Sequence, residues 1–302
     1  MYDVIIVGAG PAGMTAAIYT TRAGYKTLIV DKAAPGGQAS NTDLIENYPG
    51  FPDGVSGPEL MMKFYEQAGN LGAQYSFENI TELKLEGDVK KVITPSNTYE
   101  ARAVIIATGA RPLTLGVPGE DKFIGKGVSY CATCDGFFFK GKNVVVVGGG
   151  DTAVQEALYL TKICSKVTLI HRRDQLRATK ILRDKILANE KVEVIWDTVV
   201  EEIIGENQVE GVRIHNLKTG EKSILPTEGV FVFIGYLPNS DFLSSPIELD
   251  QRGYIISDSG LRTNIPGVFV IGDVRQKAIR QVATAVGDGA QVVVALSEYL
   301  EG

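Results

Sequence analysis

The strongest constraint on the fold is an internal repeat, in which one unit occurs twice at an offset of 140 residues. Residues 3–32, DVIIVGAGPAGMTAAIYTTRAGYKTLIVDK, align with residues 143–172, NVVVVGGGDTAVQEALYLTKICSKVTLIHR. Each copy reads as a buried strand, a glycine-rich turn, a helix and a second buried strand. Strands joined through a helix run parallel, so the repeat predicts an α/β protein with two Rossmann-like domains.

The turn in each copy carries the glycine spacing of a dinucleotide-binding fingerprint. The matching positions are Gly8, Gly10 and Gly13 in the first copy and Gly148, Gly150 and Ala153 in the second. The first two positions allow a tight bend and close approach of a pyrophosphate, and the third lets helix and strand pack closely. Two ordinary crossovers that bind nothing are the alternative, and the recurrence of the pattern in both copies argues against it.

The two copies differ at the end of the second strand, where the ribose of a dinucleotide is read. The first copy has Asp31, whose carboxylate can accept hydrogen bonds from a ribose diol. The second copy has His171, followed by Arg172, Arg173 and Arg177. Guanidinium groups bind a 2′-phosphate that a carboxylate would repel, so we expect NADPH at the second site. A solvated helix start is the plainer interpretation, but the alignment with the ribose-reading position favours the functional one.

The order of the elements predicts a nested arrangement of two three-layer ββα domains. One domain is expected to combine residues 1–116 with residues 246–302, and the other to occupy residues 117–245. The connections between them are short, so we expect the domains to rotate relative to each other. Residues 34–51, rich in Gly, Pro and Asn, are long for a plain connection and are interpreted as a ligand loop.

Composition disfavours several classes of function. The chain of 302 residues has a formal net charge of -6 and no long basic stripe, so no nucleic-acid partner is expected. Its apolar runs are strand-sized and shorter than a membrane span. The N-terminus lacks the basic region and cleavage-like site of a secretory signal, and three cysteines do not make a disulfide framework. These features predict a soluble cytoplasmic protein without a membrane partner.

Cys131 and Cys134 form a CxxC motif shortly before the second glycine-rich turn. A zinc knuckle needs two further ligands, and only Cys164, His171 and His215 remain, so no metal site is expected. A structural disulfide is unusual in a cytoplasmic protein. The remaining interpretation is dithiol–disulfide exchange, in which one cysteine attacks as a thiolate and the other resolves the mixed disulfide. Cys164 is interpreted as a packing residue.

Disulfide exchange also needs a proton for the departing thiolate, and Asp135 is the nearest candidate for a general acid. An aspartate beside a loop is otherwise only solubilising. A dithiol does not take hydride cleanly from a nicotinamide, whereas a flavin accepts hydride and reduces a disulfide. We therefore expect FAD at the first dinucleotide site, where Asp31 and the GGQ loop lie.

Taken together, these motifs resemble the low-molecular-weight bacterial thioredoxin reductases. The resemblance rests on GAGPAG, PGGQ, ENYPGF, ATGARP, CATCDG, GGGDTA, HRRDQLRA and GDVRQKAIRQVATA, in the family's order from the first residues to the last helix. Related peroxiredoxin-reducing flavoproteins carry an additional N-terminal domain, and related ferredoxin–NADP reductases lack the CxxC. The resemblance implies that NADPH reduces a thioredoxin disulfide through FAD and the Cys131–Cys134 pair.

The resemblance also implies a role for each matching position. For FAD it implies contacts at Gly8, Gly10, Gly13, Asp31, Gln38, Asn47, Asp273, Arg280 and Gln281. For NADPH it implies contacts at Gly148, Gly150, Ala153, His171, Arg172, Arg173 and Arg177. It implies that Cys134 is the sulfur next to the flavin, Cys131 the sulfur that attacks the partner, and Asp135 the acid–base group.

The family resemblance further implies a homodimer, and a rotation of the smaller domain that brings in the nicotinamide and exposes the thiols. Of Phe137, Phe138 and Phe139, at least one is expected to face away from the core, because adjacent strand residues face opposite sides. This run is interpreted as a docking patch for thioredoxin or as the start of the domain core. Lys126 stands where the family more often has Arg, which puts the preference for a partner in doubt.

Other functions stay open. Relatives that take electrons from ferredoxin would keep the flavin and CxxC but lose the arginine cluster, which is intact here. A non-catalytic redox sensor would need neither the proton donor nor the NADPH site. A glutaredoxin-like partner in place of thioredoxin is not distinguished by the sequence.

Overall fold

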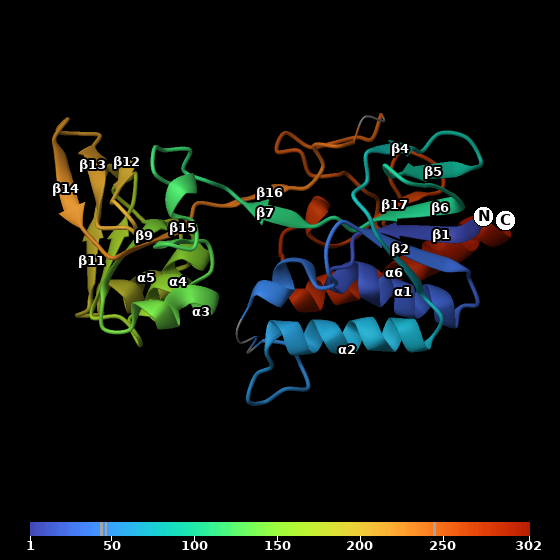
Figure 1. Ribbon diagram of the computed structural model, residues 1–302, viewed down its shortest axis with the longest axis horizontal. Coiled ribbons are helices and arrows are strands. Elements are labelled where there is room, and N and C mark those ends of the chain that lie inside the picture. The colour runs from blue at the N-terminus through green and yellow to red at the C-terminus, as the bar shows by residue number, and fades with distance from the viewer. Residues whose placement is uncertain (43–44, 46, 244–245) are drawn as a thin grey trace. The chain divides into compact units, whose positions relative to one another are not determined.

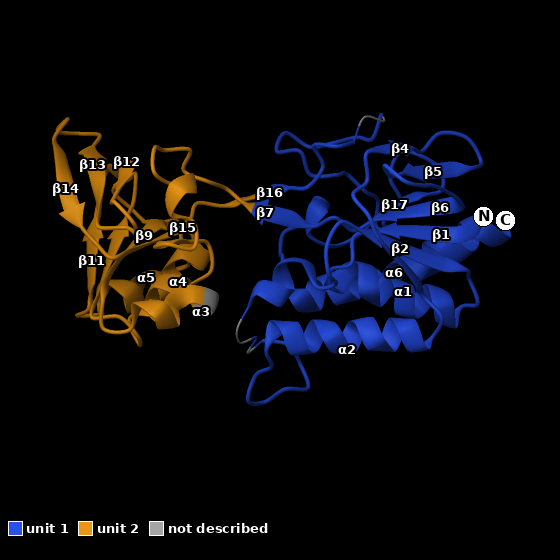
Figure 2. Ribbon diagram, in the orientation of Figure 1, with its two compact units in different colours: residues 1–111, 237–302 blue, residues 112–236 orange. Residues whose placement is uncertain are grey.

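The computed structural model describes residues 1–42, 45, 47–243 and 246–302, and it describes residues 133 and 134 by their backbone alone. The chain forms two compact units (Figure 2): residues 1–111 with 237–302 make unit 1, and residues 112–236 make unit 2. The expected domain boundaries, after residues 116 and 245, lie C-terminal to these. The chain changes unit where β7 (Ala110–Pro112) pairs with β16 (Tyr236–Pro238) in a two-stranded ribbon, a pairing that local sequence does not reveal.

Unit 1 contains a mixed sheet and three long helices. Its other elements in chain order are β1 (Tyr2–Val7), α1 (Pro11–Arg22), β2 (Thr27–Asp31), η1 (Gly37–Asn41), α2 (Gly57–Asn70), β3 (Gln74–Phe77), β4 (Glu82–Lys84), β5 (Lys90–Ile93), β6 (Thr98–Ile106), β17 (Val268–Val270), η4 (Gly272–Val274) and α6 (Val282–Glu301) (Figure 1). The strand order is β3-β2-β1-β6, and β6 also pairs in parallel with β17 and antiparallel with β5. Figure 1 shows α1, α2 and α6 on one side of this sheet.

The layers of unit 1 follow from the alternation of side chains along its strands. Val4 and Ile6 of β1 pack with apolar residues of α1 and α6, whereas Ile5 and Val7 pack with residues of β4 and β5. Successive residues of a strand point to opposite faces, so the continuous apolar run of β1 fills two cores. Helix α2 begins where Ser56 accepts a hydrogen bond from the amide of Glu59, a standard N-cap.

Unit 2 repeats this plan with its own elements. They are η2 (Asp121–Phe123), β8 (Val128–Ser129), α3 (Ala132–Asp135), η3 (Gly136–Phe139), β9 (Asn143–Gly148), α4 (Asp151–Leu160), β10 (Lys166–Ile170), α5 (Lys180–Leu187), β11 (Val192–Ile195), β12 (Thr198–Ile204), β13 (Gly211–Asn216), β14 (Lys222–Pro226) and β15 (Gly229–Phe233). The sheet β11-β10-β9-β15-β8 is parallel, and β12-β13-β14 form a separate antiparallel sheet.

The layers of unit 2 also alternate along the central strand. Val144 and Val146 of β9 pack with apolar residues of α4, whereas Val145 and Val147 pack with residues of β12 and β13. Each unit therefore has helices on one face of its parallel strands and further β-strands on the opposite face. This confirms the predicted α/β fold of two Rossmann-like domains. In the described parts of the chain, no helix is both long enough and apolar enough to span a membrane.

Candidate functional site

The glycine-rich turn of unit 1 leaves an open helix end. Gly8 has a φ of 111°, and a Cβ there would lie 2.4 Å from the carbonyl O of Ala107. A Cβ at Gly13 would lie 1.9 Å from the carbonyl O of Gly8, whereas Gly10 faces open space. Helix α1 starts at Pro11 without a side-chain cap, so the amides of its first turn can bind an anion. The three predicted glycines form a cradle that fits a pyrophosphate.

Asp31 lies beside this cradle at the end of β2. Its Oδ2 accepts a hydrogen bond from the amide of Ala9 at 2.6 Å, and its Oδ1 accepts one from the amide of Ala33 at 3.1 Å. The carboxylate is only partly buried, and each of its oxygens has a second lone pair for a ligand hydroxyl. Its charge suits a ribose diol and disfavours a 2′-phosphate.

The C-terminal segment brings Asp273 to the same cradle. Gly272 has a φ of 74°, and a Cβ there would lie 2.9 Å from the Cβ of Ala12 in the first turn of α1. The buried Oδ1 of Asp273 accepts no hydrogen bond from the described residues, and the Nζ of Lys277, at 3.4 Å, pairs with it only as an ion. Burial raises the pKa of this carboxyl. A buried acceptor without a donor fits a ligand hydroxyl.

Three further residues predicted near the flavin also come together. The Nδ2 of Asn47 donates to the Oε1 of Gln281 at 2.9 Å, although the two residues are 234 positions apart. The guanidinium of Arg280 lies 3.9 Å from the centre of the Tyr254 ring. Its Nε donates to the backbone O of Asp273 at 3.3 Å. These contacts fix the start of α6 beside the cradle.

Gln38 lies exposed in η1, in the loop that follows β2. The amide of Gly36 donates to the backbone O of Ala9 at 2.8 Å. A Cβ at Gly37 would lie 3.4 Å from the Cα of Gly10. The start of the predicted ligand loop, at Gly36 and Gly37, therefore lies directly against the glycine-rich turn; residues 43, 44 and 46 of that loop lie outside the described residues.

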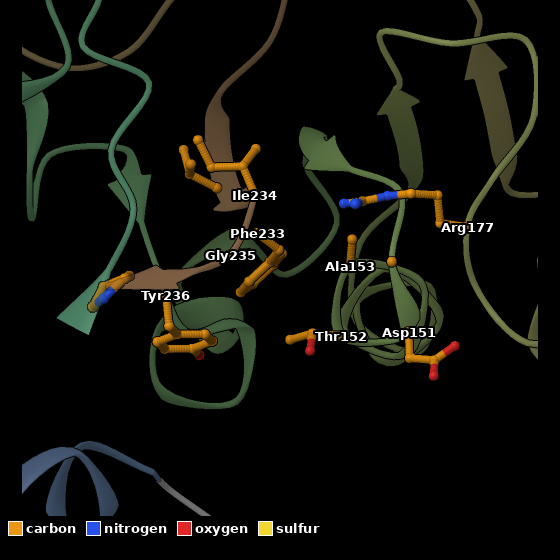
Figure 3. Close-up of a pocket in the computed structure, with 11 residues that line it drawn as sticks. Asp151, Thr152, Ala153, Arg177, Phe233, Ile234, Gly235 and Tyr236 are labelled. Carbon is orange, nitrogen blue, oxygen red and sulfur yellow. The ribbon is translucent and has the colours of Figure 1, made fainter. Parts of the chain in front are cut away.

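The glycine-rich turn of unit 2 has the same form and borders a pocket. A Cβ at Gly148 would lie 2.4 Å from the backbone O of Phe233, and Gly150 faces open space. The pocket lies within unit 2 and is lined by Gly150, Ala153, Arg177 and Phe233 among others. Figure 3 shows Arg177 reaching towards it from the loop after β10, with the first turn of α4 beside it and Phe233 across from it.

Arg172, Arg173 and Arg177 lie exposed on the loop between β10 and α5. Among the residues that the structure describes, none of the three arginines forms a salt bridge. The amide of Arg177 donates to the backbone O of Gly149 at 2.7 Å, which fastens the loop to the glycine-rich turn. Guanidinium groups without a carboxylate partner leave positive charge and planar donors for an anion such as a 2′-phosphate.

His171 takes a different position from the three arginines. Its side chain is buried, its Nε2 lies 3.1 Å from the backbone O of Gln175, and a Cβ on Gly149 would lie 2.2 Å from its ring. Burial lowers the pKa of this imidazole, so it is neutral at pH 7. A buried neutral ring supports the turn from the core side and presents no charge to a phosphate.

Cys131 immediately precedes α3 and is disulfide-bonded. Its amide donates to the Oγ of Ser129 at 3.1 Å, and the amide of Asp135 donates to its backbone O at 3.2 Å. The side chain of Cys134 lies outside the described residues. Cys164 is a free thiol in the core of unit 2, and burial raises its pKa to about 11. The interpretation of Cys164 as a packing residue is confirmed.

The three phenylalanines after the CxxC divide between surface and core. Phe137 and Phe138 are 70% and 71% exposed, whereas Phe139 is buried against the Phe231 ring at 5.1 Å between centroids. The expectation that at least one faces away from the core is confirmed. Its stated reason was wrong, because the segment is a 3-10 helix and not a strand.

Sequence reasoning missed residues that hold these groups in place. Glu156 of α4 accepts a hydrogen bond from the amide of Ala132 at 3.1 Å, beside Cys131. Asp288 and Lys277 are buried next to Asp273. The single charged residue in the helical segment AVGDGAQVVVA was the available signal for Asp288.

Comparison with known proteins places the chain in a family. Residues 2–289 match the family described as pyridine nucleotide-disulphide oxidoreductase. The chain is 50% identical over 303 residues to a thioredoxin reductase of Listeria innocua, covering 100% of this chain and 94% of that protein. The crystal structure of Lactococcus lactis thioredoxin reductase matches with a TM-score of 0.90 and 46% identity, over 100% of this chain and 99% of that one.

A ferredoxin-flavin thioredoxin reductase from Clostridium acetobutylicum matches with a lower TM-score, 0.54, and 32% identity, over 99% of this chain and 98% of that one. The chain belongs to the pyridine nucleotide-disulphide oxidoreductase family. The resemblance to the bacterial thioredoxin reductases is confirmed.

Proposed function

We propose that the protein is an NADPH-dependent thioredoxin reductase that holds FAD in unit 1 and NADPH in unit 2. One observation carries the proposal: the disulfide-bonded Cys131 shares a unit with a dinucleotide turn that is bordered by three exposed arginines. When bound in unit 1, a flavin supplies the two-electron exchange that links nicotinamide chemistry to disulfide chemistry. The side chains of this protein supply the binding, the orientation, the sulfur and the protons.

Unit 1 offers groups that suit the separate parts of FAD. The glycine cradle with Gly10 at its open face would hold the pyrophosphate, and Asp31 the ribose of the adenosine end. The Oδ1 of Asp273 would accept from a hydroxyl of the ribityl chain. The groups assigned to the flavin end are Gln38, Asn47, Arg280 and Gln281.

Unit 2 offers a matching site for NADPH. The open face at Gly150 would hold the pyrophosphate, with Gly148 and Ala153 shaping the turn. Arg172, Arg173 and Arg177 would bind the 2′-phosphate, and His171 would support their loop. This division supports NADPH rather than NADH, and a nicotinamide donor rather than ferredoxin.

The exchange step belongs to the CxxC. In the reduced enzyme, the Cys131 thiolate attacks one sulfur of the thioredoxin disulfide, and the departing sulfur takes a proton. Asp135, in the same helical turn, supplies that proton as the general acid. Cys134 then displaces thioredoxin from the mixed disulfide, so the pair is oxidised and the partner gains two electrons and two protons. Neighbouring Phe137 and Phe138 supply exposed apolar surface for the partner.

Two further properties belong to this proposal because the family resemblance supports them. The enzyme acts as a homodimer in the cytoplasm. Sedimentation equilibrium of the holoenzyme tests the first property, with a single species of twice the chain mass as the expected result.

Replacement of the cysteines tests the proposed relay. We expect Cys131→Ser and Cys134→Ser each to abolish NADPH-dependent reduction of thioredoxin while NADPH still bleaches the flavin. Cys164→Ala is the matched control, because that thiol is buried and unpaired, and it should keep thioredoxin reduction. Continued thioredoxin reduction by both single CxxC variants would contradict the proposal.

A further inference from the structure

A buried group of charged side chains lies between the Asp273 turn and α6, and the proposed function leaves most of it unexplained. At its centre is Asp288, which is 5% exposed and is the only charged residue in the segment 282–297 of α6. A buried carboxylate is costly unless it is paired and hydrogen-bonded. A buried carboxylate at this position therefore needs a structural or functional explanation.

Asp288 fastens the Asp273 turn to α6. Its Oδ2 accepts from the amide of Gly272 at 2.9 Å and from the Nε of Arg275 at 2.8 Å, and its Oδ1 accepts from the Nη2 of Arg275 at 2.9 Å. Burial alone would raise the pKa of Asp288, but the Arg275 hydrogen bonds and the Lys277 charge outweigh it and hold that pKa below its usual value. The residues on both sides of Asp273 are therefore held in place.

Lys277 lies between two carboxylates. Its side chain is 7% exposed, and its Nζ lies 3.2 Å from the Oδ2 of Asp288 and 3.4 Å from the Oδ1 of Asp273. The Arg275 guanidinium is committed to Asp288 through two hydrogen bonds, and that of Arg280 stacks on an aromatic ring. Lys277 is thus the cation placed to balance Asp273 and Asp288 together.

The charge balance at Asp273 depends on this ammonium. Burial raises the pKa of Asp273 and the charge of Asp288 adds to the rise, whereas Lys277 and Arg280 oppose it. Without Lys277, the buried carboxylate of Asp288 would face the partly exposed carboxylate of Asp273, whose Oδ1 is buried, across the turn. Asp273 would then gain a proton or rotate away, and its free oxygen would no longer be a strong acceptor.

We propose that Lys277, anchored by Asp288, is a positioning residue that keeps Asp273 an ionised acceptor for a hydroxyl of the bound flavin cofactor. The inference rests on the proposed function, because it requires a flavin in unit 1. It adds to that function a residue that acts on cofactor affinity through Asp273 and touches no reacting atom.

The test is FAD binding to apoprotein, measured by calorimetric titration, in a double-mutant cycle. Lys277→Gln should weaken FAD about tenfold to a hundredfold, the effect of one lost charge-assisted contact. Lys277→Arg keeps the charge and should stay within about threefold of wild type, as should the control Lys63→Gln, which removes an exposed ion pair with Glu59. In an Asp273→Asn background, Lys277→Gln should add less than about twofold.

An equal loss in both backgrounds would overturn the inference, because Lys277 would then act without Asp273. No loss in either background would overturn it as well. If Lys277→Gln does not fold, Lys277→Met takes its place, and failure of both to fold would show a structural role and reject the inference. Wild-type apoprotein that binds no FAD would instead reject the proposed function, whatever the variants do.

Discussion

The two glycine-rich turns of this protein have nearly the same backbone and opposite charge. In both, one glycine permits the bend, a second faces open space, and the helix starts without a side-chain cap. At the end of the next strand, unit 1 has the carboxylate of Asp31, whereas unit 2 has a neutral buried His171 followed by exposed arginines. Under the proposed function, the backbone of each turn would hold a dinucleotide, and the side chains at one position would select which dinucleotide binds.

The two units differ most in packing at the third position of the turn, which is Gly13 in unit 1 and Ala153 in unit 2. A Cβ at Gly13 would lie 1.9 Å from the backbone O of Gly8, whereas unit 2 already holds a methyl at Ala153. We expect Gly13→Ala to destabilise unit 1 by about 3 kcal/mol, the upper range for overpacking. Ala153→Gly is the reciprocal control and should cost about 1 kcal/mol, the penalty for glycine in a helix.

These two variants can be followed separately because each unit has its own signal. Trp196 is the single tryptophan of the chain and lies in unit 2, while flavin release reports on unit 1. Thermal unfolding of Gly13→Ala should lower the temperature of flavin release much more than that of the Trp196 transition. Equal shifts in the two signals would show that the units do not differ in this packing.

The next largest expected effect is on NADPH binding, and it concerns the loop between β10 and α5 that carries the arginines. Replacing Arg172 and Arg173 together with Ala removes two guanidinium groups that have no protein salt bridge to lose among the described residues. We expect the KM for NADPH to rise at least about a hundredfold, because two charge-assisted contacts are lost and each is worth about 1.5–3 kcal/mol. The KM for NADH should change less than about threefold. An equal loss for both nucleotides would reject the 2′-phosphate assignment.

Asp31 tests the same comparison from unit 1. Asp31→Asn keeps one acceptor oxygen but replaces the other by an NH2 group. If that NH2 group faces the amide N–H of Ala9, two donors meet and the hydrogen bond is lost. We expect FAD to bind the apoprotein about tenfold more weakly, because roughly one hydrogen bond between the carboxylate and a ribose hydroxyl is lost. Binding of NADPH in unit 2 should be unchanged. A loss of NADPH affinity of similar size would show that the two sites are not separate.

The smallest expected effect is a loss of stability at low pH. It arises in unit 1, where the carboxylate of Glu78 accepts several hydrogen bonds. This carboxylate accepts hydrogen bonds from Thr94, Tyr99, Ser76 and Asn97. They hold its pKa at about 2, below the ordinary 4.5. A depressed folded-state pKa stabilises the fold above the unfolded pKa, and this stabilisation is lost as pH falls from about 4.5 towards 2.

Glu78→Ala should remove that contribution from the pH profile of unit 1. In wild type, the temperature of flavin release should fall more steeply than that of the Trp196 transition as the pH falls through 4.5. In Glu78→Ala the two slopes should converge. Unchanged slopes would show that Glu78 does not link β3 to the β5–β6 hairpin energetically.

Much of the fold was predictable because the repeat combines buried strands with glycine spacing at fixed positions. The sequence alone indicates the roles of Gly8, Gly148 and Asp31, because their positions in the turn and at the end of the strand define those roles. The gathering of Asn47 and Gln281 was not predictable from spacing, because it joins segments 234 residues apart. It came only from the resemblance to a family.

Other features could not be read from sequence for physical reasons. Phe137 to Phe139 follow neither the period of a strand nor that of an α-helix, so their 3-10 turn and their split between surface and core were not distinguished. His171 stood in a charged run, and its burial depends on packing against Gly149. The unit boundaries depend on the pairing of β7 with β16, which is a long-range contact.

The most direct test of the account is an anaerobic titration of the holoenzyme with NADPH and then with NADH, followed by flavin absorbance. We predict bleaching at low NADPH with uptake of more than one two-electron equivalent, because flavin and dithiol are both reduced. Addition of oxidised thioredoxin should then restore the colour. NADH should be much less effective. A flavin that neither nicotinamide bleaches would contradict the account and favour a ferredoxin donor or a redox sensor.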